Sequence, residues 1–172
     1  MQDIERDQPA PAEDVHGVEL AAVAADPAAF SHLYRENFDK MARLAFLLIG
    51  SRDDARDVVQ DAFVGLHRRF DRVDDPVAYL RRSVVNGCHS HHRRRARRAK
   101  RFVMVDESVE LGARELLDAL GALPLRQRAA IVLRYFHDLP EAEIALVLGC
   151  RPGTVGSLLH RGLARLREVI ER

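Results

Sequence analysis

Residues 143–155, EIALVLGCRPGTV, decide the fold of the C-terminal part of the chain. Ala145 is small enough to let two helices approach closely, Gly149 accepts a tight turn, and Pro152 fixes the start of a further helix. Apolar residues then recur on one face of that helix, at Val155, Leu159 and Leu166. This order predicts a helix-turn-helix, whose second helix can enter the major groove of DNA. An ordinary helical hairpin is the alternative for this segment.

The same segment resembles the promoter −35-binding region of sigma-70 family transcription factors. The residues that match the pattern of the family are Glu143, Ile144, Ala145, Leu148, Gly149, Gly153, Thr154, Val155, Ser157, Leu159, Arg161, Leu166 and Arg167. The resemblance implies that the −35 DNA is contacted by Arg151, Thr154, Ser157, His160, Arg161 and Arg165.

Four positions depart from the pattern of the family. Gly156 stands where the family usually has a basic residue, and Leu158 stands where it often has arginine. Arg151 replaces the usual helix-capping serine, and Gly162 replaces alanine. We therefore expect the chain to lose two cationic contacts to −35 DNA and to gain one.

Three helices are expected ahead of this segment, in the N-terminal half. Asp26-Pro27 indicates the cap and first residue of a long amphipathic helix that ends at Gly50. Ser51, with Asp54 three residues later, resembles a capping box that opens a second helix. Asp75-Pro76 indicates the start of a third helix.

The second of these helices has one apolar and one acidic face. Its sequence from Asp53 to Phe63 resembles the sigma region 2 helix that docks on the largest subunit of RNA polymerase. Acidic side chains and a glutamine suit an arginine-rich partner surface, because charge-assisted pairs favour register and rapid association. The resemblance implies core-polymerase contacts from Asp54, Asp57, Gln60, Asp61 and Phe63. On charge alone, a solvated face is the simpler interpretation.

The third helix changes from apolar to basic along its length, since its apolar stripe ends at Cys88 and arginines and histidines follow. It resembles the −10 recognition helix of the family. An aromatic ring offers a stacking surface, asparagine can hydrogen-bond a base edge, and arginines neutralise phosphates. The −10 contacts implied by the resemblance are Tyr79, Arg82, Asn86, His89, Arg93, Arg94 and Arg95.

Charge is segregated along the chain, although 27 basic residues nearly balance 26 acidic ones. Residues 30–101 and 123–172 are rich in basic groups, whereas acidic groups dominate before and between them. This pattern predicts two polyanion-binding units with an acidic connector. We expect an all-α protein of two small helical domains joined by a flexible linker. The expected segments are an acidic disordered tail at 1–25, a region 2 domain at 26–101, a linker at 102–112 and a region 4 domain at 113–172.

Several other classes of protein are disfavoured. Cys88 and Cys150 are far apart and show neither a disulfide framework nor metal-ligand spacing. The longest apolar run, Leu44 to Ile49, falls far short of the roughly 20 residues that span a bilayer. Sequence signatures of a nucleophile elbow, a phosphate loop or paired catalytic carboxylates are missing. We therefore expect a cytoplasmic protein that is not an enzyme, has no metal or cofactor and does not contact a membrane.

The resemblance to the compact, extracytoplasmic-function (ECF) kind of sigma factor covers about residues 28–172. It implies a protein that binds core RNA polymerase, reads the −35 duplex with its C-terminal domain and melts and holds the −10 region with its N-terminal domain. Control by an anti-sigma protein or by expression is expected. Two alternatives remain open: a helix-turn-helix regulator that acts without polymerase, and a scaffold whose arginines hold RNA.

Overall fold

The computed structural model describes residues 26–97 and 111–171, and its regular structure within these ranges is entirely helical. The elements are α1 (Pro27–Ile49), α2 (Arg52–His67), the 3-10 turn η1 (Phe70–Arg72), α3 (Pro76–Arg97), α4 (Leu111–Gly121), α5 (Leu125–Tyr135), α6 (Glu141–Leu148) and α7 (Pro152–Ile170). The predicted tail, most of the predicted linker and the end of the basic tract lie outside the described residues.

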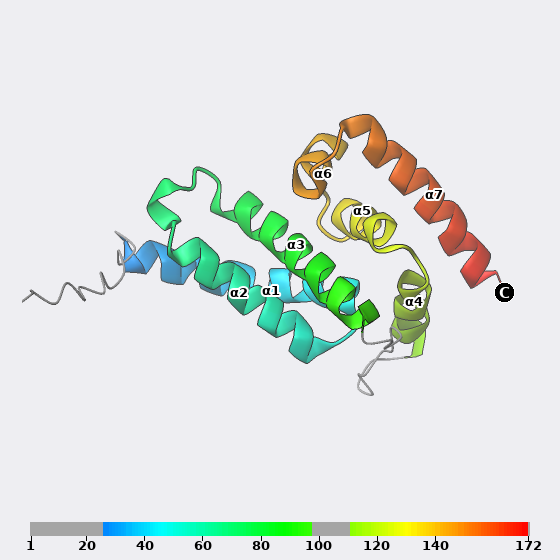
Figure 1. The fold of residues 1–172 in the computed structure, drawn as a ribbon, viewed down its shortest axis with the longest axis horizontal. Coiled ribbons are helices and arrows are strands. Elements are labelled where there is room, and N and C mark those ends of the chain that lie inside the picture. Colours follow the sequence, from blue (N-terminus) through cyan, green and yellow to red (C-terminus); the bar gives the residue numbers. More distant parts are fainter. Residues whose placement is uncertain (1–25, 98–110, 172) are drawn as a thin grey trace, which may run out of the picture.

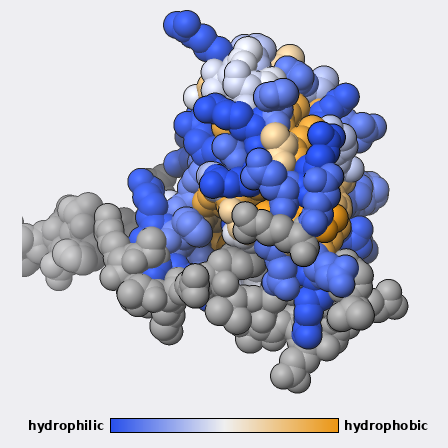
Figure 2. Space-filling view, turned by 90° about the vertical axis from the view of Figure 1, so that its right-hand side faces the viewer, coloured by the Kyte–Doolittle hydropathy of each residue, from blue (hydrophilic) through white to orange (hydrophobic). Residues whose placement is uncertain are grey.

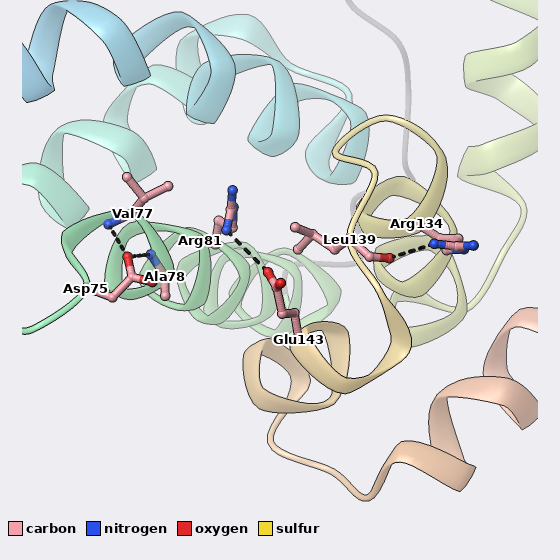
Figure 3. Close-up of polar contacts among 7 residues, drawn as sticks. All are labelled: Asp75, Val77, Ala78, Arg81, Arg134, Leu139 and Glu143. Carbon is pink, nitrogen blue, oxygen red and sulfur yellow. Dashed lines mark hydrogen bonds and ion pairs between the residues drawn. The ribbon is translucent and has the colours of Figure 1, made fainter.

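Helices α1, α2 and α3 form the first bundle, and their capping residues act as the sequence predicts. The Asp26 carboxylate accepts hydrogen bonds from the backbone amides of Ala28 and Ala29 at 2.9 and 3.0 Å. Gly50 ends α1 with a left-handed φ of 79°. At the start of α3, Asp75 Oδ1 accepts from the amides of Val77 and Ala78 at 3.0 and 2.9 Å (Figure 3).

Helices α4 to α7 form the second bundle, in which α6 and α7 are the predicted helix-turn-helix. Gly149 ends α6 with a left-handed φ of 59°, and α7 begins at Pro152. The two helices meet at 96°, within the range typical of this motif. Helix α4 begins at Leu111, two residues before the predicted domain boundary.

The turn between α5 and α6 holds a strained residue. Asp138 has a φ of 50°, in the left-handed region that favours glycine. The next residue, Leu139, is buried, and its carbonyl accepts a hydrogen bond from Arg134 Nη1 at 3.1 Å (Figure 3). The turn therefore fixes where α6 leaves α5.

The two bundles pack against each other, with α1 touching α4 and α5, and α3 touching α6. Figure 1 shows α7 on the side of the second bundle that faces away from α3. The buried apolar residues of both bundles form one contiguous core. We call the contact between the bundles the seam and define it by Leu48, Arg81, His89, Arg128 and Glu143.

One polar side chain crosses the seam in its interior. Arg128 of α5 is only 1% exposed. It donates hydrogen bonds to the carbonyls of Leu48 in α1 at 2.5 Å, Gly121 at 2.8 Å and Leu123 at 3.1 Å. Burial lowers the pKa of Arg128 to about 10, so the guanidinium remains charged at neutral pH.

Within the described parts of the chain, no single helix is both long and apolar enough to cross a membrane; only the sharply bent pair α6 and α7 reaches that level when taken together.

Candidate nucleic-acid and protein interfaces

The outer face of α3 presents a basic and polar surface to solvent. Of the predicted −10 residues, Arg82, Asn86, Arg93 and Arg94 are exposed. Arg82, Asn86 and Arg93 follow one another at spacings of four and seven residues, which places them along the same side of the helix. The structure thus brings together hydrogen-bonding and cationic groups opposite the buried stripe of Leu80, Val84 and Cys88.

Tyr79 and His89, also predicted −10 residues, are half-buried at the edges of this face. The Tyr79 hydroxyl lies beside Gly65 of α2 and accepts a 3.4 Å hydrogen bond from Arg69 Nη1, just after the end of that helix. Burial, together with the cations Arg126 and Arg93 and with His92, lowers the pKa of His89. His89 is therefore neutral at physiological pH and lies beside α5 of the other bundle.

Asp54 and Arg95 face each other instead of facing outward. The Asp54 carboxylate lies 3.7 Å from Arg95 Nη1 and 3.4 Å from His91 Nε2, so it fastens the start of α2 to the end of α3. Its backbone amide meanwhile donates to Ser51 Oγ at 3.3 Å, which is the Ser51 half of the predicted capping box. Both charges are thus engaged within the bundle, and the contacts of Asp54 with polymerase and of Arg95 with phosphates stay predictions.

The acidic face of α2 is otherwise available to a partner. Asp57, Gln60 and Asp61 are exposed, as the sequence predicts. Phe63 is only 3% exposed, and its contact with polymerase stays a prediction. Its position in the apolar stripe, which the sequence also shows, explains its burial in the core.

A groove of about 430 Å³ lies between α1 and α2 beside this acidic face. No pattern in the sequence indicates this groove. Aromatic rings form its floor, with the centroid of Phe63 4.8 Å from that of Tyr34 and 6.4 Å from that of Phe30. Val64, 51% exposed, lines it, as do Gln60 and Asp61. The acidic face thus adjoins an apolar recess.

Helix α7 carries a second exposed face at its N-terminal end. The predicted −35 residues Arg151, Thr154, Ser157, His160, Arg161 and Arg165 are all exposed. Two of them are held by backbone bonds, since Ser157 Oγ donates to the Gly153 carbonyl at 3.2 Å and Arg161 Nε donates to the Ser157 carbonyl at 3.1 Å. The helix therefore presents partly ordered polar groups in the position of a recognition helix.

The departures from the family pattern separate into two kinds. Leu158 is 7% exposed and faces the core, so a side chain at this position does not reach the exposed face of α7. The leucine therefore does not remove a cationic contact with DNA, contrary to expectation. Gly162 is also buried, and a Cβ atom at this position would lie 2.8 Å from Ile131 Cδ1 of α5. Gly156 differs, because it lies in a shallow hollow with Ser157, His160 and Arg161 on the exposed face. Only Gly156 removes a cation from that face.

Cys88 and the histidines after it do not come together around a metal. Cys88 is fully buried, and burial raises the pKa of its thiol to about 12. In residues 26–97 and 111–171, no group of three His, Cys, Asp or Glu side chains is placed to hold a metal ion.

The face that carries α4 and α7 is mainly hydrophilic, with apolar side chains gathered in its middle (Figure 2). The exposed large apolar residues of these two helices are Leu116, Leu163 and Ile170.

A helix-turn-helix with an exposed polar recognition helix, joined to a bundle with its own cationic face, defines a DNA-binding protein of the transcription machinery. The sigma-70 region 2 family model matches residues 33–98, and the sigma-70 region 4 model matches residues 113–166. The chain belongs to the sigma-70 family of RNA polymerase sigma factors, in its ECF group.

Curated relatives include the RNA polymerase sigma-E factor of Streptomyces avermitilis, 36% identical over 154 residues, which cover 83% of this chain and 85% of the relative. The ECF RNA polymerase sigma factor SigM of Mycobacterium tuberculosis is 35% identical over 163 residues, covering 87% of this chain and 81% of the relative.

Among solved structures, CnrH in complex with the cytosolic domain of CnrY has a TM-score of 0.69 at 27% identity, covering 87% of this chain and 92% of that chain. The sigma factor RpoE of Bartonella quintana, in complex with the anti-sigma factor NepR, has a TM-score of 0.71 at 23% identity, covering 83% and 97%. At 23% identity, the likeness to RpoE supports the fold alone.

Proposed function

We propose that this sigma factor docks on core RNA polymerase through the acidic face of α2, holds the opened −10 region on the outer face of α3 and reads the −35 duplex with the start of α7. The observation that carries the proposal is the placement of three distinct faces on one chain. An acidic face and a basic face share the first bundle, and a second basic face lies on the helix-turn-helix.

The outer face of α3 suits a DNA strand pulled from its duplex. Arg82, Arg93 and Arg94 can neutralise phosphates, and Asn86 can donate to and accept from a base edge. Because Arg95 is paired with Asp54, the phosphate contacts fall to the exposed arginines. Tyr79 is half-buried, with its hydroxyl bonded to Arg69, and can offer the exposed part of its ring to a base.

The start of α7 suits a major groove. Thr154, Ser157 and Arg161 project from its first turns, where base edges come within reach of a recognition helix. Arg151, just ahead of the helix, can contact a phosphate. Gly156 has no side chain that can enter the major groove. The base pair opposite it would therefore be contacted only by neighbouring residues.

The α2 face suits a basic helical partner. Asp57 and Asp61 lie four residues apart, which places them on one side of the helix, and Gln60 lies between them. Exposed charges of this kind mainly set the association rate and the register. The groove beside them can receive an apolar side chain of the same partner.

Two further expectations follow from family membership. CnrH was solved with the cytosolic domain of CnrY, and we expect a regulatory protein of the anti-sigma kind to bind this chain as well. A protein that works on polymerase and promoter DNA acts in the cytoplasm, at the nucleoid. Affinity purification of the tagged full chain from its own cells tests the first expectation.

The test of the proposed function is run-off transcription from a set of promoter fragments with purified core polymerase. Wild-type protein should produce discrete start sites, and Asp57→Lys with Asp61→Lys should abolish them by preventing polymerase binding. Glu115→Lys with Asp118→Lys, which makes the same charge change on two exposed residues of α4, is the matched control and should remain active. Folded wild-type protein that binds promoter DNA but never redirects core polymerase would point instead to a regulator acting alone.

A further inference from the structure

We infer that Glu141 takes part in selecting the −35 sequence, by accepting a hydrogen bond from a cytosine in the major groove. Glu141 belongs to α6, the first helix of the helix-turn-helix, and lies outside the residues that the proposed function assigns to DNA. The inference rests on the proposed function, because it needs the start of α7 to lie in the −35 duplex.

The side chain of Glu141 reaches from α6 to the exposed face of α7. Glu141 is the first residue of α6 and is itself exposed. Its Oε2 atom lies 3.5 Å from the place that a Cβ atom of residue 156 would occupy, so the carboxylate rests against α7 at Gly156. A basic side chain at position 156, as the family usually has, would grow out toward this carboxylate. The exposed face therefore carries a negative charge close to where the family usually has a positive one.

The shallow hollow at Gly156 has two hydrogen-bond acceptors at its edge. The residues that line it are Gly156, Ser157, His160 and Arg161. The Ser157 hydroxyl donates its proton to the carbonyl of Gly153 at 3.2 Å, so its oxygen can only accept a further bond. The carboxylate of Glu141, when ionised, is also an acceptor only. The hollow thus suits a base edge that presents a donor.

Cytosine is the base whose major-groove edge fits such a hollow. Its N4 amine is a donor, and it presents no acceptor in the major groove. Adenine presents an N7 acceptor beside its N6 donor, guanine presents two acceptors, and thymine presents an acceptor and a methyl group. An acceptor on the base would face the carboxylate of Glu141 and the oxygen of Ser157. Glutamate accepting from cytosine N4 is, moreover, a common pairing between proteins and DNA.

Two simpler roles of Glu141 lead to different expectations. A carboxylate in the first turn of a helix stabilises that helix through its dipole, as Glu143 in the same turn of α6 also does. A carboxylate close to DNA also repels phosphates, which lowers the affinity for every sequence alike. Only a contact with a base changes the preference at one position and leaves the other positions as they are.

The test is a selection of −35 sequences by the full chain assembled with core RNA polymerase. The library is a promoter at which the wild-type factor gives a discrete start site, with its −35 element randomised. Sequencing the DNA before and after binding gives the base preference at each position. The wild-type factor should enrich cytosine at one position by about fivefold, the lower end of what a good base contact provides. Glu141→Gln should reduce this preference to about twofold or less, because an amide donates as well as accepts.

The other positions of the element are an internal reference, since their preferences should not change in Glu141→Gln. Glu168→Gln is the matched control, because it removes the same charge from another exposed residue of the helix-turn-helix and should leave every preference unchanged. Glu141→Ala, which has neither donor nor acceptor, should lose the preference at the same position as Glu141→Gln. Circular dichroism and urea unfolding show whether each variant is folded.

The results separate the inference from the proposed function. Identical preferences in wild type and folded Glu141→Gln overturn the inference, and a uniform rise in affinity would then assign Glu141 to phosphate repulsion. A preference that depends on Glu141 but favours a base other than cytosine also overturns it. Failure of the wild-type factor to assemble with polymerase overturns the proposed function, and selection with the full chain alone at low salt then decides whether Glu141 reads a cytosine.

Discussion

Replacing Gly162 by alanine probes how closely α7 lies on α5. The new Cβ would lie 2.8 Å from Ile131 Cδ1 and 3.3 Å from Gln127 Cβ. Carbon atoms in contact normally stay about 3.5–4.0 Å apart, so one of the neighbours has to move. Ile131 is 3% exposed, and its δ-methyl therefore has little free space to move into.

Two opposing effects set the magnitude. Alanine is favoured over glycine inside a helix by about 0.8–1.0 kcal/mol. Overpacking a well-packed core costs about 1–3 kcal/mol. We therefore expect Gly162→Ala to lower the free energy of unfolding by about 1 kcal/mol in the wild-type background. In an Ile131→Val background the obstructing methyl is absent, and the same change should raise stability by roughly 0.5 kcal/mol because helix preference then prevails.

The assay is urea unfolding of the four proteins in this double-mutant cycle, followed by circular dichroism. A coupling energy of about 1–2 kcal/mol between the two positions is the expected result. If Gly162→Ala stabilises the protein equally in both backgrounds, α7 does not approach α5 as closely as described. Close packing would then not explain the glycine at position 162.

Four further results are expected. Asp54→Asn should break the pair with Arg95 and let this arginine contact a phosphate. The logarithm of the affinity for single-stranded −10 DNA should then fall more steeply with the logarithm of the salt concentration, by about 0.7 in slope. Fluorescence anisotropy over a KCl series measures the slope, and an unchanged slope counts against the internal pair. Gly156→Arg should tighten binding to the −35 duplex and steepen the salt dependence of that binding by about 0.9 in slope. Electrophoretic mobility shifts at several salt concentrations detect this. No change would mean that the hollow at Gly156 faces away from DNA. Asp138→Gly should raise the free energy of unfolding by up to about 1 kcal/mol, because glycine adopts the left-handed conformation without strain. Urea unfolding measures it. A lower urea midpoint would show that the Asp138 side chain stabilises the protein by more than the strain costs. Burial, first, and neighbouring cations, second, lower the pKa values of His89, His92 and His137 in the folded protein. Unfolding returns these pKa values toward about 6.5, so the unfolded chain binds more protons and the free energy of unfolding should decrease as the pH falls through that value. Urea unfolding at a series of pH values measures this, and a protein that becomes more stable as the pH falls would be the contrary result.

Local signals in the sequence were sufficient to place the helices. Asp26 and Asp75 cap the helices that they precede, and Gly50 and Gly149 end helices in left-handed conformations. Each of these signals acts between residues a few positions apart, where backbone chemistry alone decides the outcome. The same is true of the apolar stripes, which predicted the buried face of each helix.

The sequence could not show which side chains have partners on another helix. Helical periodicity placed Asp54 with the acidic face of α2, but the end of α3 supplies Arg95 and His91 to it. Nor could it show that the buried ring of Phe63 forms part of the floor of a groove between α1 and α2. Spacing along one helix cannot show which neighbour covers its ends.

Arg128 had no signal at all in the sequence. An arginine between Gln127 and Ala129 in a helix resembles any other surface cation, since arginine is rarely buried. Its burial depends on three backbone carbonyls, one of them 80 residues away along the chain. The packing of the two bundles against each other was likewise beyond prediction, because it follows from surfaces and not from a local pattern.

The contrast between the two cysteines gives the wild-type chain a built-in chemical handle. Cys88 is fully buried with its pKa raised to about 12, whereas Cys150 is partly exposed in the turn just ahead of α7. A maleimide dye should therefore label the native protein at one thiol, next to the recognition helix. Fluorescence from that dye would report promoter engagement without any engineered substitution.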